Sequence, residues 1–200
     1  MSAAHAAAGG EVVTNPGAAS GKHFDPKGTL PSKFTIELRK GVSASLPFED
    51  KRDFDEAKKG FIAEPPYKKI MADAGHVAWD MASYQWLLQG KDFQSIHPSL
   101  QRQAVLNMAY GLYEVVPGRI YQVRGYDLAN ISFIKGDTGW IVFDPLTAAE
   151  TARAALNLIN EKLGKRPVVG VVYSHTHVDH WAGVRGVVDE ADVVSGKVML

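Results

Sequence analysis

The fold is decided by one stretch, VVGVVYSHTHVDH, at residues 168–180. Its first six residues form a nearly continuous apolar run, which is typical of a strand covered on both faces of a sheet. The next seven residues contain three histidines and one aspartate. Functional groups collect just beyond the carboxyl ends of strands in open α/β sheets, because side chains leave the packed core there. We therefore expect a strand over 168–173 and a functional site in the loop that follows it.

The histidines and the aspartate of this loop have the spacing of metal ligands. In an extended segment, alternate residues point the same way, so His175, His177 and Asp179 share one face. His180 is expected to reach the opposite side once the chain turns toward Gly183. Three imidazoles and a carboxylate suit zinc, and two ions could each take two of these ligands. The chain has no cysteine, so thiolate ligands and disulfides are excluded.

A β-hairpin is predicted upstream of the loop. Residues 131–134 and 140–143 are rich in β-forming side chains, and Gly-Asp-Thr-Gly at 136–139 supplies a tight turn between them. Asp144 ends the second run before Pro145. Because a ligating imidazole usually donates its other N–H to a carboxylate or carbonyl, Asp144 is a candidate to support the metal ligands. An aspartate that merely ends a strand before proline is an equally good interpretation.

A helix is predicted between the hairpin and the apolar run. Thr147 and Glu150 match a capping box that opens a helix over 148–163, and Gly164 is expected to adopt left-handed backbone after its end. Strand, helix and strand then form a βαβ unit with parallel strands. The fold class expected from this order is α/β.

Three regions are predicted along the chain. Residues 1–33 are rich in Ala, Gly, Ser and Pro, and are expected to form a flexible tail. Residues 34–112 are expected to pack on the core, with a short helix over 100–113 from its apolar spacing. Residues 113–200 are expected to form the first part of an α/β domain. Residues 191–200 have the pattern of an apolar strand, and the given sequence ends there. That domain is therefore predicted to be truncated at its C-terminal end.

Composition excludes several kinds of partner. The chain has 22 basic and 22 acidic side chains, so it lacks the positive charge that nucleic-acid binding needs. No run of about 18 apolar residues is present, so no transmembrane segment is expected. The N-terminal MSAAHAAAGG lacks the basic and apolar regions of a signal peptide.

The loop motif His175-x-His177-x-Asp179-His180 resembles that of the metallo-β-lactamase superfamily, and residues 130–144 look like the opening hairpin of that family. A closer resemblance, from about residue 47 to the end, is to the alkyl sulfatases of this superfamily. The strings that carry it are Pro98–Leu100, Gly111–Val115, Ile120–Asn130, Asp144–Leu146 and His180–Gly186.

The resemblance implies an αββα sandwich of the metallo-β-lactamase type, of which only the N-terminal part is present. It also implies a site for two Zn²⁺ ions, with His175 and His177 on one ion and Asp179 and His180 on the other. Asp179 would in addition orient the attacking water as a catalytic residue. The remaining ligands and the substrate-binding residues would follow the end of this chain.

The activity that the resemblance implies is zinc-dependent hydrolysis of alkyl sulfate esters, such as dodecyl sulfate, to alcohol and inorganic sulfate. The full-length protein would be a homodimer in the periplasm or outside the cell. Two alternatives stay open: a thioester or lactone hydrolase built on the same metal core, and an inactive fragment that lacks the remaining ligands. Attack at sulfur and attack at carbon are both compatible with the sequence.

Overall fold

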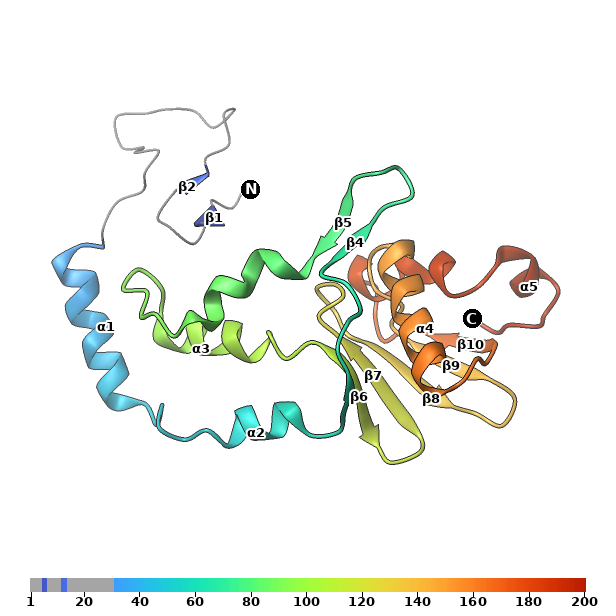
Figure 1. The fold of residues 1–200 in the computed structure, drawn as a ribbon, viewed down its shortest axis with the longest axis horizontal. Helices are drawn as coiled ribbons and strands as arrows, with labels where there is room; N and C mark the ends of the chain where they lie inside the picture. Colours follow the sequence, from blue (N-terminus) through green and yellow to red (C-terminus); the bar gives the residue numbers. More distant parts are fainter. Residues whose placement is uncertain (1–4, 7–11, 14–30) are drawn as a thin grey trace. The chain divides into compact units, whose positions relative to one another are not determined.

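The computed structural model describes residues 5–6, 12–13 and 31–200 (Figure 1). Most of the tail expected over 1–33 therefore lies outside the described residues. Within it, β1 (His5–Ala6) and β2 (Val12–Val13) pair antiparallel. Helix α1 (Lys33–Ser45) begins before the expected end of the tail.

The described residues separate into two compact units, one made of those up to residue 50 together with residues 85–105, and the other of residues 51–84 and 106–200. The boundary between residues 112 and 113 that the sequence suggests stays a prediction. In the first unit, Arg39 of α1 forms an ion pair with Asp92 and donates a hydrogen bond to the carbonyl of Ile96 at 2.8 Å. These bonds join α1 to the segment before α3 (Pro98–Leu106).

The second unit contains most of the helices and strands that the structure describes. Its strands are β3 (Phe61–Ala63), β4 (Lys69–Met71), β5 (Val77–Asp80), β6 (Gly111–Val116), β7 (Ile120–Arg124), β8 (Ile131–Lys135), β9 (Trp140–Phe143) and β10 (Val168–Val172). Its helices are α2 (Arg52–Lys58), α4 (Ala149–Leu163) and α5 (Glu190–Val194). It also contains two 3₁₀ turns, η2 (Val178–His180) and η3 (Ala182–Gly186). A longer 3₁₀ helix, η1 (Met81–Gln89), has residues in both units.

A six-stranded sheet organises this unit, in the order β10-β9-β8-β7-β6-β3. The predicted hairpin is confirmed as the antiparallel pair β8–β9, in which Phe133 lies opposite Val142. Strand β10 runs parallel to β9, so β9, α4 and β10 form the predicted βαβ unit. Because β9 and β10 are parallel neighbours, their carboxyl ends open at the same edge of the sheet.

Helix α4 covers one face of this sheet. Its inner side chains, such as Ala155 and Leu158, join Val142 and Val171 of the strands in one buried core. Trp140 of β9 is also buried there, and its indole N–H donates a hydrogen bond to the side chain of Asn160 at 2.9 Å. Strand β10 is buried only at its centre, because it lies at the end of the strand order; the expectation of a strand covered along its whole length is wrong.

The predicted capping box of α4 is wrong. The N-cap is Ala148, which makes no side-chain capping bond. Thr147 instead donates its hydroxyl to Asp127 at 2.8 Å, and Glu150 accepts from the backbone N–H of Asp73 at 3.0 Å. Gly164 has a positive φ of 92°, but its ψ of 141° lies outside the left-handed helical region, so that detail is also wrong.

Two other local predictions also differ from the structure. The helix expected over 100–113 ends at Leu106, because Gly111 has a φ of 136° and begins β6, which pairs along β7. The strand expected over 191–200 is instead helix α5, and only Met199 joins the sheet, by a parallel bridge to Gly170. In both places, a backbone pairing with a distant part of the chain sets the structure, and the local pattern does not reveal it. Within residues 31–200, no helix combines the length and the apolar character needed to cross a bilayer.

Candidate metal centre

The candidate site lies where the two parallel strands end. Asp144 follows β9 and Ser174 comes two residues after β10. The backbone N–H of Asp144 donates to the carbonyl of Val172 at 3.0 Å, which keeps the two strand ends in register. The sequence prediction that the motif follows a strand at the sheet edge is therefore confirmed.

The turn after β9 has an unusual backbone. Asp144 has a φ of 56° and Leu146 a φ of 62°, and these are the non-glycine residues with positive φ in the described part of the chain. Such a conformation costs about 1–3 kcal/mol for each residue, and it persists only where the surroundings hold it in place. Here Leu146 is fully buried, its N–H bonds the carbonyl of Asp144 at 2.9 Å, and its carbonyl accepts from the N–H of Gly183 at 2.9 Å.

The turn aims the Asp144 carboxylate at the motif. It accepts the backbone N–H of Ser174 at 2.7 Å and the Ser174 hydroxyl at 2.6 Å, and it contacts Nδ1 of His180 at 2.8 Å. Burial acts to raise the pKa of Asp144, but the hydrogen bonds from Ser174 and His180 outweigh it and hold the pKa below its usual value. Asp144 is therefore ionised at neutral pH and can only accept hydrogen bonds.

The ionised carboxylate fixes the tautomers of two histidines. Because Asp144 can only accept, Nδ1 of His180 must carry the proton between them. The Ser174 hydroxyl donates its single proton to Asp144. Its oxygen must therefore accept from Nδ1 of His175, which is 2.8 Å away. In the neutral forms of His175 and His180, the lone pair is then on Nε2, which is the arrangement that a metal ligand needs.

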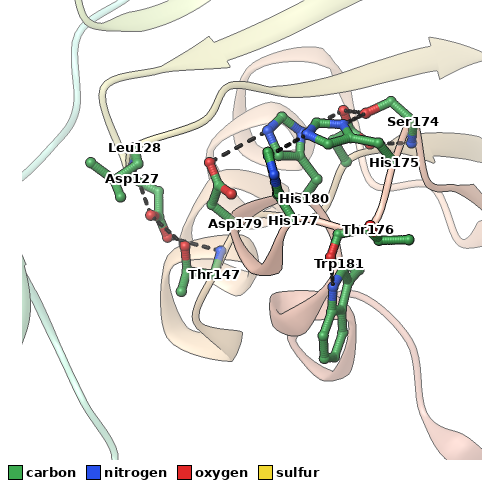
Figure 2. Close-up of polar contacts among 11 residues, drawn as sticks. Asp127, Leu128, Thr147, Ser174, His175, Thr176, His177, Asp179, His180 and Trp181 are labelled. Carbon is green, nitrogen blue, oxygen red and sulfur yellow. Dashed lines mark hydrogen bonds and ion pairs between the residues drawn. The ribbon is translucent and has the colours of Figure 1, made fainter.

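The four motif side chains form two pairs (Figure 2). Nε2 of His175 lies 3.1 Å from Nδ1 of His177, and Nε2 of His180 lies 3.4 Å from Oδ2 of Asp179. The ring of His180 lies 4.1 Å from that of His175, so the expectation that His180 points to the opposite side is wrong. The short turn η2 bends the segment back and keeps His180 beside the other ligands.

Both pair distances are compatible with a metal ion. Two ligands of one tetrahedral zinc ion lie about 3.3 Å apart, given zinc–nitrogen bonds near 2 Å. Nε2 of His180 also faces a carboxylate oxygen of Asp179, so the two groups form an ion pair when the imidazole is protonated and offer two donor atoms to a cation when it is neutral. Among the residues that the structure describes, no three histidine or carboxylate groups are placed to hold one ion. In the described part of the chain, the motif therefore offers two pairs of nitrogen and oxygen donors and no single site with three or more of them.

Few contacts within the motif itself hold it in place. His175 and His177 are exposed, and so is most of the loop. The loop is closed by the indole N–H of Trp181, which donates to the carbonyl of Thr176 at 3.1 Å, and by the N–H of His180, which donates to the carbonyl of His177 at 3.0 Å. The buried turn at Asp144 therefore supplies most of the positioning.

A buried aspartate that the sequence reasoning did not single out lies behind the turn. Asp127, in the loop between β7 and β8, accepts the N–H and the hydroxyl of Thr147 at 3.1 and 2.8 Å. It also accepts the hydroxyl of Thr151 and the N–H of Leu128, at 2.8 and 2.7 Å. No spacing in the sequence marks this role, because the partners are about twenty residues away. Figure 2 shows the Asp127 carboxylate turned toward Thr147.

Comparison with known proteins places this site in a class. Residues 124–200 match the metallo-beta-lactamase superfamily, and they contain the hairpin, the βαβ unit and the motif described above. This part of the chain is therefore similar to proteins of that superfamily.

The similarity extends to particular enzymes. The chain is 48% identical over 84% of its length to an (R)-specific secondary-alkylsulfatase of Pseudomonas sp. and 50% identical over 78% to a linear primary-alkylsulfatase of Pseudomonas sp.. It is 40% identical over 83% of its length to an alkyl/aryl-sulfatase of Saccharomyces cerevisiae. The solved structure of the stereoselective inverting sec-alkylsulfatase Pisa1 from Pseudomonas sp. matches 85% of the chain with a TM-score of 0.78 and 48% identity.

These matches confirm the resemblance to the alkyl sulfatases of the metallo-β-lactamase superfamily, and the mixed α/β fold class. The chain spans about a quarter of the length of these relatives: 25%, 23% and 26% of the three enzymes and 26% of the solved structure. The match therefore describes a partial metallo-β-lactamase fold.

Proposed function

We propose that the protein hydrolyses alkyl sulfate esters to alcohol and inorganic sulfate with the help of two zinc ions. The observation that carries the proposal is the pairing of the four motif side chains, with each pair spaced like two ligands of one ion. The similarity to enzymes named alkylsulfatases supplies the substrate class.

In this proposal, Nε2 of His175 and Nδ1 of His177 bind one ion, and Nε2 of His180 and the carboxylate of Asp179 bind the other. Bound zinc would lower the pKa of a water molecule toward about 7 and offset the negative charge of the sulfate group. The proton on Nδ1 of His180 stays on that nitrogen and is donated to the Asp144 carboxylate, so Nε2 remains available as a ligand. Asp179, which is only partly buried, accepts a hydrogen bond from the attacking water and orients it.

We propose attack at carbon as the route. One relative is described as an inverting enzyme, and inversion of configuration requires that the bond to carbon breaks. The water oxygen forms a bond to the carbon, the carbon–oxygen bond of the ester breaks, sulfate leaves with the electron pair, and the water gives up one proton. Sulfate is a good leaving group, so this route needs no general acid.

The activity is tested on the zinc-loaded full-length protein with dodecyl sulfate and a secondary alkyl sulfate, by measuring inorganic sulfate. We expect sulfate release that falls at least a hundredfold in His177→Ala. The matched control is His76→Ala, which changes an exposed histidine outside the site. Hydrolysis of a thioester or a lactone without sulfate release would overturn the proposal in favour of the other hydrolase.

The route is tested in water enriched in heavy oxygen. Attack at carbon places the label in the alcohol, whereas attack at sulfur places it in the sulfate. Label in the sulfate would contradict the proposed route and leave the activity itself intact.

A further inference from the structure

We propose that Asp127 is a positioning residue for the metal centre: it clamps the strained turn after β9 and so keeps the Asp144 carboxylate on Ser174 and His180. The inference rests on the proposed function, since it concerns the same site. Asp127 contacts none of the four motif side chains among the contacts that the structure describes, so its effect would pass through the turn.

The first step is the strain in the turn. Asp144 and Leu146 both have positive φ, and neither is glycine. Left free, these two residues would relax toward negative φ, and the Asp144 carboxylate would rotate away from its partners. The turn is therefore a place where outside contacts decide the geometry.

The second step is what holds the two ends of the turn. At the start, the N–H of Asp144 bonds Val172 of the neighbouring strand. At the end, Thr147 is held by two hydrogen bonds to Asp127, one from its backbone and one from its hydroxyl. Asp127 is 8% exposed, so these bonds to its carboxylate meet little competition from water.

The third step separates this role from an ordinary helix cap. Asp127 also accepts the hydroxyl of Thr151 in the first turn of α4, and a negative charge there favours the helix. The single Thr151 proton is shared with the carbonyl of Ala148 at 2.9 Å. If Asp127 served only the helix, loss of the Thr151 bond would matter as much as loss of the Thr147 bonds.

The experiment compares Asp127→Asn with Thr151→Val in the full-length protein. An asparagine keeps the size but replaces one of the two carboxylate oxygens by an N–H₂ group, so the acceptor of one of the two Thr147 bonds is lost. Zn²⁺ affinity is measured by competition with a coloured chelator, and the Nδ1–H signal of His180 is followed by NMR in the metal-free protein. Asp137→Asn, on the exposed turn between β8 and β9, is the matched control.

We expect Asp127→Asn to weaken Zn²⁺ binding by about tenfold or more and to shift or broaden the His180 signal. Loss of a residue that positions metal ligands typically lowers metal affinity by that factor. Thr151→Val should change the affinity less than threefold, and Asp137→Asn should not change it. If Asp127→Asn does not fold, Thr147→Val is used instead, with a smaller loss of affinity expected.

Two outcomes would overturn the inference: a His180 signal and an affinity that stay unchanged in the clamp variant, or an equal loss in Thr151→Val. A protein that binds zinc but releases no sulfate would contradict the proposed function and still test the clamp. A protein that binds no zinc would also contradict the proposed function, and the His180 signal would then test the clamp alone.

Discussion

Two neighbouring segments end parallel strands at the same edge of the sheet, and they are built in opposite ways. The turn after β9, residues 144–147, is buried and strained, and it supplies none of the proposed ligands. The segment after β10, residues 174–180, is mostly exposed and carries all four of them. The comparison indicates that the segment with the proposed ligands has few contacts of its own. The buried turn beside it holds these side chains in position.

The contrast makes physical sense. Metal ligands must stay accessible to the ion and the substrate, so they cannot be locked by burial. A buried turn can be held firmly, because its hydrogen bonds are shielded from water. One carboxylate, Asp144, then connects the two segments.

The largest expected difference between the segments is in stability. Leu146→Ala removes a fully buried side chain from the turn and should lower the free energy of unfolding by about 2–5 kcal/mol. Val178→Ala changes an exposed side chain in the ligand segment and should stay within about 0.5 kcal/mol. Urea unfolding of both variants measures this, and equal effects would contradict the comparison.

A second change tests the contact between the turn after β9 and η3, the 3₁₀ turn that follows the ligand segment. A Cβ on Gly183 would lie 2.1 Å from the carbonyl oxygen of Pro145, so Gly183→Ala should destabilise the protein by about 1–3 kcal/mol. Gly41→Ala is the control, because a Cβ at that position of α1 meets nothing within 4 Å. There a gain of about 0.5–1 kcal/mol is expected. A neutral Gly183→Ala would mean that the backbones are not in tight contact.

Changing Asp144, the carboxylate that connects the two segments, should lower the metal affinity more than the stability of the fold. Asp144→Asn can no longer accept all three bonds, and the tautomers of His175 and His180 are no longer fixed. Zn²⁺ affinity should fall by about tenfold to a hundredfold. Asp192→Asn, which removes a surface ion pair with Lys197, is the control. Unchanged zinc affinity in Asp144→Asn would refute the role of this carboxylate.

The smallest effect is expected at Ser174. Its hydroxyl fixes the tautomer of His175 only, so Ser174→Ala should weaken zinc binding by a few fold, up to about tenfold, which is the value of one hydrogen bond. Ser195→Ala removes a comparable exposed hydroxyl that bonds a carbonyl of α5 and should change nothing. A loss at Ser174 as large as that at Asp144 would show that the first ligand pair is the more sensitive one.

The sequence predicted the elements with strong local signals. The hairpin, helix α4 and strand β10 were correct, because period-two and helical apolar patterns persist over several residues there. Predictions that depended on one or two residues failed. Thr147 and Glu150 have the spacing of a capping box, but Asp127 and Asp73 offered better partners from distant parts of the chain.

By itself, the sequence determined the chemistry of the candidate site: three imidazoles and a carboxylate within six residues, after an apolar strand, in a chain without cysteine. Only the tertiary structure decided how these groups pair, which ring nitrogens are free and which buried carboxylates hold them. The reason is physical. Ligand types and their spacing are local properties, whereas Asp144 and Asp127 reach their partners through sheet packing across about twenty to thirty-six residues of chain.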